Sequence, residues 1–137
     1  MKFKLSPKLR VAAALSVVAL LGASMELPLS QACAAEAQVS FSEDILPLLK
    51  WRCASCHQRG AEGYQASGLD LTSYQGLMKG TKFGPMVVPG DPETSNLMML
   101  LDWRVAPAIR MPHGKKQLST CDRASIRTWI RQGAKDN

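Results

Sequence analysis

The sequence is poor in aromatic residues and has no convincing β-strand pattern. Phe, Trp and Tyr make up only 6% of its 137 residues, and no segment alternates apolar and polar residues as a half-buried strand does. It also lacks a Lys/Arg-rich run with interleaved aromatics, the pattern typical of nucleic-acid-binding chains. These absences argue against an all-β domain and against a nucleic-acid partner. They favour an all-α fold with few helices and long loops.

The first 35 residues have the pattern of a secretory signal. Four of the first ten residues are basic, an uncharged run rich in Ala, Val and Leu spans 11–25, and small residues follow at 32–35. The apolar run is shorter than the roughly 20 residues that cross a bilayer. We therefore predict a signal peptide over 1–35 and a periplasmic protein, with an uncleaved membrane anchor as the alternative. Cleavage would lower the net charge from +6 to +3, because Glu26 and the four basic residues are removed.

The remaining chain predicts one domain over 41–134, preceded by a loose polar leader at 36–40. Helical spacing and capping residues predict helices over 41–50, 73–79, 92–101 and 120–132. Pro47 lies inside the first of these, so we expect that helix to be irregular or kinked. Glycines at 60, 63 and 68 predict a loop after it. On the last helix, arginines at 123, 127 and 131 predict a solvated face.

One motif carries specific chemistry. Cys53, Cys56 and His57 form Cys-x-x-Cys-His, the attachment signature of c-type haem. Each thiol adds across one haem vinyl group, and the histidine that follows directly presents its imidazole to the iron. Attachment takes place outside the cytoplasm, which agrees with the predicted signal. A haem is also a large apolar disc that would complete the modest core of a small chain poor in aromatics.

Other interpretations of the two cysteines are weaker. A thioredoxin-type pair requires a βαβ pattern, and none is visible. A structural zinc site requires four ligands at suitable spacing, which the chain does not offer. A disulfide between Cys53 and Cys56 would leave His57 unexplained. We therefore predict one covalent haem c.

The second iron ligand is predicted to be a methionine, because Met/His ligation is typical of electron-carrying cytochromes c. Met111 lies in a loop before the last helix, and Pro112 stiffens its backbone. Met86, on another proline-stiffened loop, is the main competitor. His113 would give bis-histidine ligation, and an open iron site is the remaining alternative. The other methionines, Met78, Met98 and Met99, are predicted to pack.

Several segments together resemble the planctomycete-type branch of cytochrome c domains, a branch of the class I fold. They are 53–57, 68–71, 89–92, 95–97, 110–112 and 126–134. The resemblance covers 41 to about 134 and implies that the first and last helices pack across each other while loops wrap the haem. It also implies that His57 and Met111 are the axial pair. The sequence departs from the family's frequent Met-Pro-Pro by having His113 after Pro112.

These observations predict an exported, mono-haem electron carrier that is not an enzyme and exchanges single electrons with redox protein donors and acceptors. One alternative is a cytochrome subunit docked permanently to an oxidoreductase or membrane complex. Another is a peroxidase or gas-binding protein with an open iron. Asp70 and Asp102 are predicted to be structural. Cys121 is predicted to be a small buried residue at the start of the last helix, with an intermolecular disulfide as the alternative.

Overall fold

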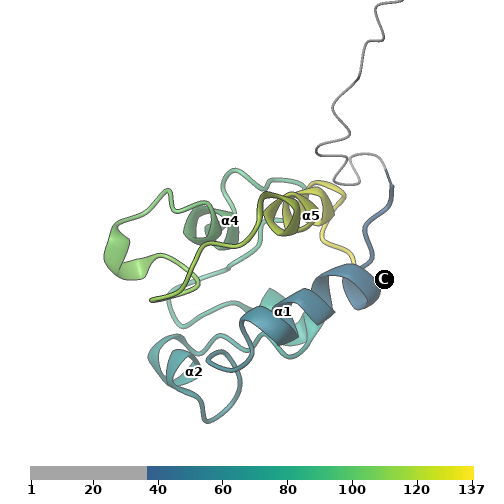
Figure 1. The fold of residues 1–137 in the computed structure, drawn as a ribbon. Helices are drawn as coiled ribbons and strands as arrows, with labels where there is room; N and C mark the ends of the chain where they lie inside the picture. The colour runs from purple at the N-terminus through teal and green to yellow at the C-terminus, as the bar shows by residue number, and fades with distance from the viewer. Residues whose placement is uncertain (1–36) are drawn as a thin grey trace, which may run out of the picture.

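The computed structural model describes residues 37–137, so the predicted signal peptide over 1–35 lies outside the described residues. The elements in chain order are η1 (Phe41–Ile45, a π-helical turn), α1 (Leu46–Arg52), α2 (Glu62–Ser67), α3 (Tyr74–Lys79), α4 (Asn96–Leu101), η2 (Pro107–Ile109, a 3-10 turn) and α5 (Thr120–Arg131). No strand forms within 37–137, where Thr81 and Gly84 make one isolated bridge. The expected all-α class with long loops is confirmed (Figure 1).

The first helix is irregular, as Pro47 predicts. Ser40 caps it: its Oγ accepts a hydrogen bond from the Glu43 N–H (3.2 Å), and its own N–H donates to the Asp44 carboxylate (2.8 Å). Pro47 lies in the first turn of α1 and has no N–H to donate, so the regular hydrogen-bond ladder cannot continue back through it. The preceding turn is the wider η1, in which the Leu46 N–H donates to the Phe41 carbonyl.

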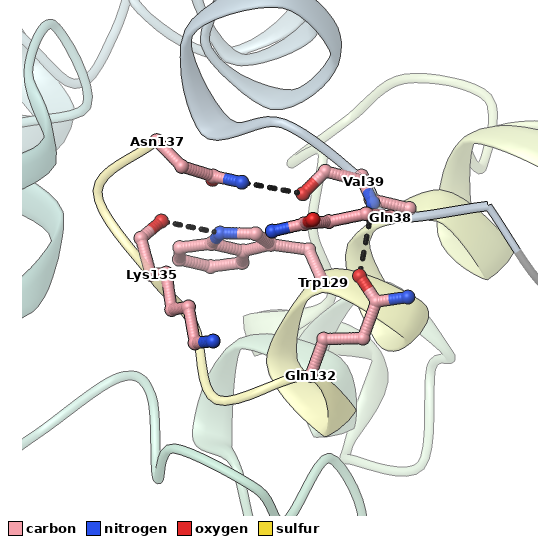
Figure 2. Close-up of a pocket in the computed structure, with 6 residues that line it drawn as sticks. All are labelled: Gln38, Val39, Trp129, Gln132, Lys135 and Asn137. Atoms are coloured by element: carbon pink, nitrogen blue, oxygen red, sulfur yellow. Dashed lines mark hydrogen bonds between the residues drawn. The ribbon is translucent and has the colours of Figure 1, made fainter.

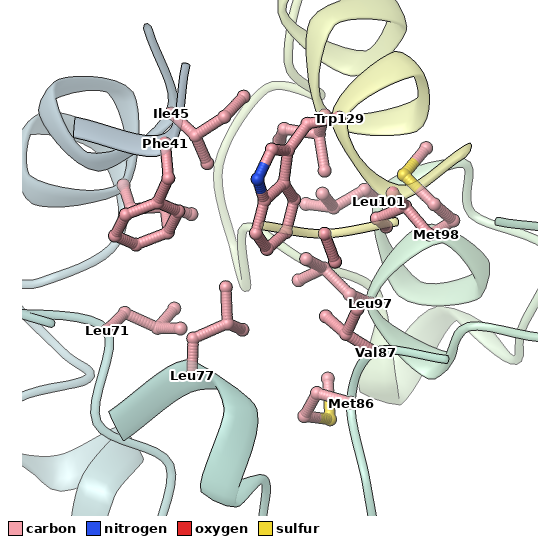
Figure 3. Close-up of a cluster of buried hydrophobic side chains, with 14 of the residues drawn as sticks. Phe41, Ile45, Leu71, Leu77, Met86, Val87, Leu97, Met98, Leu101 and Trp129 are labelled. Atoms are coloured by element: carbon pink, nitrogen blue, oxygen red, sulfur yellow. The ribbon is translucent and has the colours of Figure 1, made fainter. Parts of the chain in front are cut away.

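The core sits where η1 and α3 meet α5. Phe41, Tyr74 and Trp129 form an aromatic cluster, with ring centroids 5.2 Å apart for Phe41–Tyr74 and 5.3 Å for Phe41–Trp129. Aliphatic side chains from α3 and α4 surround it, among them Leu77 and Leu97 (Figure 3). The first and last helical segments are thus packed together, as the family resemblance implies. Burial of aromatic side chains of this size contributes strongly to the stability of a small core.

The two ends of the described chain are hydrogen-bonded to each other. The Val39 N–H donates to Gln132 Oε1 (2.9 Å), and the Ser42 N–H donates to the Asn137 carbonyl (2.9 Å). The Trp129 indole donates to the Lys135 carbonyl (2.9 Å) beside them (Figure 2). Val39 is only 6% exposed. The prediction of a loose leader is therefore wrong for residues 37–40, which are part of the fold.

Two helix predictions need correction. A short helix, α2, occupies 62–67, where the glycines predicted a loop. The helix predicted from residue 92 begins only at Asn96. The delay has a local cause, because the Asp91 carboxylate accepts hydrogen bonds from the Glu93 and Thr94 N–H groups and holds a tight turn.

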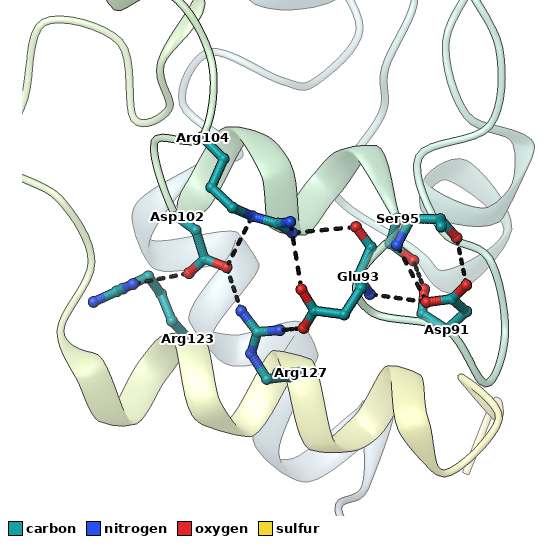
Figure 4. Close-up of polar contacts among 8 residues, drawn as sticks. Asp91, Glu93, Ser95, Asp102, Arg104, Arg123 and Arg127 are labelled. Atoms are coloured by element: carbon teal, nitrogen blue, oxygen red, sulfur yellow. Dashed lines mark hydrogen bonds and ion pairs between the residues drawn. The ribbon is translucent and has the colours of Figure 1, made fainter.

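An ion-pair network joins α4 to α5. Asp102 follows the last residue of α4, and its carboxylate lies 2.8 Å from Arg123 Nη1. Arg127 pairs with both Asp102 and Glu93, and Arg104 adds a further pair to Glu93 at 3.3 Å (Figure 4). The Asp102 side chain is only 10% exposed. The predicted solvated arginine face is therefore wrong for Arg123 and Arg127.

Candidate haem attachment site

The Cys-x-x-Cys-His motif forms a turn at the end of α1. The Cys53 carbonyl accepts hydrogen bonds from the N–H groups of Cys56 (3.1 Å) and His57 (2.9 Å). The Cys53 N–H itself donates to Leu49 on α1 (2.8 Å). Helix α1 therefore fixes the start of the motif, and a single backbone turn carries all three of its functional residues. Attachment along one haem edge requires such a turn.

The two thiols differ in exposure, and both are free. Cys53 is half-buried against the core, and burial raises the pKa of its thiol to about 11, with Arg52 and Lys115 acting in the opposite direction. Cys56 is exposed. No group of three or more His, Cys, Asp or Glu residues in 37–137 could hold a metal ion, so within this part of the chain a zinc site lacks its ligands.

His57 has the environment of a neutral metal ligand. Burial lowers the pKa of its imidazole below 6.5, while the Leu69 backbone acts in the opposite direction. Its Nδ1 is buried and has no hydrogen-bond partner among the described residues. A metal-bound imidazole donates its second N–H to a nearby acceptor, and the Leu69 backbone is the adjacent group able to take this role. The residues present therefore fit a haem bound through His57 Nε2.

Gly63 is a site residue that the sequence did not reveal. A Cβ at this position would lie 2.9 Å from both the Cys56 carbonyl oxygen and His57 Cε1, and 3.1 Å from His57 Nδ1. The glycine thus allows α2 to approach the imidazole closely. In the sequence, Gly63 by itself favours a loop, whereas the structure places it inside the six-residue helix α2.

Met111 is half-buried and packs against the core from the loop that precedes α5. Its backbone N–H donates to the Leu100 carbonyl (3.2 Å), and its carbonyl accepts from the Trp103 indole (2.9 Å). Both backbone polar groups are thereby attached to the end of α4. A thioether on a loop fixed in this way has a low entropy cost for holding a ligand position.

The competing ligands lie in different surroundings. Met86 is only 5% exposed and belongs to the core beside Leu77 and Leu97 (Figure 3). His113 is exposed, two residues beyond Met111. Met98 is fully buried, in agreement with the predicted packing role.

An open surface hollow of about 340 Å³ lies beside the motif. Trp51 and Arg52 line it just before Cys53, and Pro112, Lys115 and Lys116 line it just after Met111. Trp51 is 76% exposed. The segments that carry the two predicted ends of the site therefore face one another across a basic, partly aromatic hollow.

The remaining predicted residues are placed as follows. Asp70 accepts hydrogen bonds from the Thr72 hydroxyl (2.6 Å) and N–H (3.0 Å), and these bonds lower the pKa of its carboxyl. Asp102 holds the arginines of α5, as described above. Both carboxylates thus have structural partners. Cys121 is exposed, so the prediction that it is buried is wrong.

No helix within 37–137 has the length and apolar character needed to cross a bilayer.

Comparison with known proteins gives one match. A family model described as Planctomycete cytochrome C matches residues 53–112, which include the Cys-x-x-Cys-His motif and Met111. No curated protein and no solved structure matches the chain. Residues 53–112 are therefore similar to Planctomycete cytochrome C, and this match supports a cytochrome c-like domain with covalently bound haem and a general role in carrying electrons.

Proposed function

We propose that the protein is an exported c-type cytochrome that binds a single haem and carries one electron at a time between two redox proteins. The observation that carries the proposal is the turn 53–57, which joins two free thiols to a half-buried imidazole of lowered pKa. In this proposal Cys53 and Cys56 hold the haem through thioether bonds, and His57 Nε2 is one axial ligand of its iron. When bound, the haem supplies an iron centre that changes oxidation state by one electron.

Met111 is proposed as the other axial ligand. The supporting observations are its partial exposure, its attachment to the end of α4 and the position of its loop across the hollow from the residues before Cys53. A thioether favours ferrous iron and raises the reduction potential, which suits an electron carrier. If His57 and Met111 both bind the iron, no coordination position is left for a substrate.

The partner surface is proposed to be the hollow beside Cys53. Electron transfer between proteins requires close approach to the haem, and the residues next to a thioether lie at its edge. Arg52, Lys115 and Lys116 give this surface a positive charge, and Trp51 gives it an exposed apolar ring. An acidic partner surface would be attracted there, with an association rate that falls as salt is added. The proposal that the protein is exported, and so meets such partners outside the cytoplasm, depends on the predicted signal peptide over 1–35.

The decisive experiment is expression of the full chain in a host with working haem-ligation machinery outside the cytoplasm. We expect a coloured product whose mass exceeds that of the polypeptide by one haem, and a pyridine haemochrome spectrum typical of two thioether bonds. Cys53→Ala and Cys56→Ala should each leave one thioether bond and shift that spectrum. A colourless product of bare polypeptide mass would overturn the proposal.

The distal ligand is tested separately. The oxidised protein should show the near-infrared band that arises from Met–iron ligation, and Met111→Ala should abolish it. Met86→Leu, which keeps a similar volume in the core, and His113→Ala should both retain the band. Loss of the band only in Met86→Leu would reassign the ligand to Met86. Absence of the band in the unaltered protein, together with failure of exogenous ligands to bind, would indicate His113. Tight binding of carbon monoxide or cyanide by the unaltered protein would indicate an open iron and a catalytic or sensing role.

A further inference from the structure

Met111 is fixed through its backbone rather than through its side chain alone. Its N–H donates to the Leu100 carbonyl, and its carbonyl accepts a hydrogen bond of 2.9 Å from Trp103 Nε1. Leu100 belongs to α4, and Trp103 follows that helix after one intervening residue. Of these two hydrogen bonds, only the one from Trp103 is made by a side chain. It can therefore be removed by substitution without changing the helix backbone.

The backbone at Trp103 is unusual. Its φ is +59°, in the left-handed region that residues other than glycine rarely adopt and that costs free energy. Such a conformation persists where surrounding contacts compensate for it. Here the Trp103 N–H donates to Leu100 (3.3 Å), and the next N–H, of Arg104, donates to Met99 (3.0 Å). The left-handed turn directs the chain so that the indole reaches Met111, eight residues later.

The face of the same indole ring contacts Arg110. The Arg110 guanidinium lies 5.4 Å from the centroid of the Trp103 ring, within range of a cation–π interaction. The Arg110 Nε–H donates to the Val105 carbonyl (3.3 Å), which closes the loop on itself. The residue immediately before Met111 therefore packs on the side chain that holds Met111.

The support for Trp103 is itself rigid. Asp102, the neighbour of Trp103, is anchored to α5 by Arg123 and Arg127 (Figure 4). On the far side of the loop, the Gln117 side-chain amide donates to the Leu101 carbonyl (2.9 Å). The loop that carries Met111 is thus tied to the end of α4 at both arms and at its middle.

We propose that Trp103 is a positioning residue for the distal ligand: its indole N–H holds the Met111 carbonyl, and so favours the state in which the Met111 sulfur is bound to iron. The inference rests on the proposed function, because it requires Met111 to be that ligand. An exogenous ligand binds only when the sulfur has left the iron, so its apparent affinity measures how firmly the loop is held. Removing one hydrogen bond of typical net strength should change this equilibrium about fivefold.

The test compares two tryptophan variants of the haem-loaded full chain. Trp103→Phe removes the indole donor and retains an aromatic ring. Trp129→Phe is the matched control, because its indole also donates to a backbone carbonyl at 2.9 Å, but to that of Lys135 near the C-terminal end of the described chain. Both proteins are titrated with imidazole in the oxidised state, and their near-infrared Met–iron bands and reduction potentials are recorded.

We expect Trp103→Phe to bind imidazole about fivefold more tightly than the unaltered protein, with a weaker Met–iron band and a lower reduction potential. Trp129→Phe should lower the midpoint of urea unfolding while leaving the imidazole affinity unchanged. If Trp103→Phe does not fold, Arg110→Gln provides the second measurement, with a smaller increase in imidazole affinity because only the stacking contact is lost.

Equal imidazole affinities in the unaltered protein and Trp103→Phe would overturn the inference and leave the proposed function intact. Equal increases in Trp103→Phe and Trp129→Phe would also overturn it, because they would show general loosening of the fold. A missing Met–iron band in the unaltered protein would instead refute Met111 as the ligand.

Discussion

Replacing Gly63 by alanine probes the contact between α2 and the proposed proximal ligand. The added Cβ would lie 2.9 Å from His57 Cε1 and from the Cys56 carbonyl oxygen, whereas ordinary contact begins at 3.4 Å. The ring and the turn would each have to move by about half an ångström relative to α2. Neither the ring nor the turn can move easily, because the imidazole is rigid and the Cys56 carbonyl already accepts a hydrogen bond from the Tyr64 N–H (3.0 Å).

The expected magnitude follows from two opposing effects. Overpacking of this kind costs about 1–3 kcal/mol. Alanine in a helix is more favourable than glycine by about 1 kcal/mol, since its unfolded chain is less free. The clash involves a backbone atom and a ring, so the upper part of the first range applies. We expect Gly63→Ala to lower the free energy of unfolding by about 1–2 kcal/mol.

Urea unfolding of the purified holoprotein measures this change, provided that the slope with urea concentration is unaltered. Ala66→Gly is the matched variant, because Ala66 is an exposed residue of the same helix. It should cost about 1 kcal/mol from helix propensity alone. If Gly63→Ala proved as stable as the unaltered protein or more stable, the close approach of α2 to His57 would be refuted.

Three further changes test other parts of the fold. Asp102→Asn weakens the network between α4 and α5 and should lower the free energy of unfolding by about 2 kcal/mol, a loss that shrinks in high salt; a salt-independent loss in urea titrations would contradict the ion pairs. Hydrogen bonds from Thr72 hold the pKa of Asp70 below 3.8, so this carboxylate contributes stability that is present above pH 3.8 and lost as the pH falls through its folded-state value. Thr72→Val should therefore weaken the dependence of the free energy of unfolding on pH below pH 3.8. An unchanged pH dependence, measured by unfolding on both sides of that pH, would show that the Thr72 hydroxyl does not hold the Asp70 carboxylate. Ser95 is fully buried, and Ser95→Ala removes both the acceptor of the Val88 N–H (2.9 Å) and the donor to the Asp91 carbonyl (2.7 Å); it should cost about 1–3 kcal/mol in thermal or urea unfolding, whereas an unchanged midpoint would rule this out.

Local rules predicted the elements whose causes are local. Pro47 predicted the irregular first helix. Ser73 predicted the start of α3, where its Oγ accepts a hydrogen bond from the Gly76 N–H (3.0 Å). Ser119 begins α5 with a reciprocal capping box. The start of α4 was misplaced because Asp91 and Pro92 favour a helix start and a tight turn equally well. Only the competing hydrogen bonds of Asp91 decide between the two.

Features that depend on distant partners were not predictable in this way. Arg123 and Arg127 look like a solvated face until α4 brings Asp102 beside them. Gly63 favours a loop in the sequence, and only the structure shows that His57 occupies the space where a Cβ would lie. At the site, the motif 53–57 predicts the attachment residues, and the structure shows that they share one turn at the end of α1. The support of Met111 by Trp103 had no sequence signal, because it depends on a left-handed turn in a residue that seldom adopts one.

The hydrogen bonds that join residues 37–42 to Gln132 and Asn137 also bear on how the domain could be rearranged. Where two ends lie together, a short linker can join them, and the chain can be reopened elsewhere without disturbing the packing. A circular permutant reopened between α3 and α4 would keep the turn 53–57 and the loop before α5 each in one piece. Reopening inside 104–110 would break the chain between Met111 and the two residues that hold its backbone, Leu100 and Trp103. The order of segments therefore matters less to this domain than the continuity of that loop.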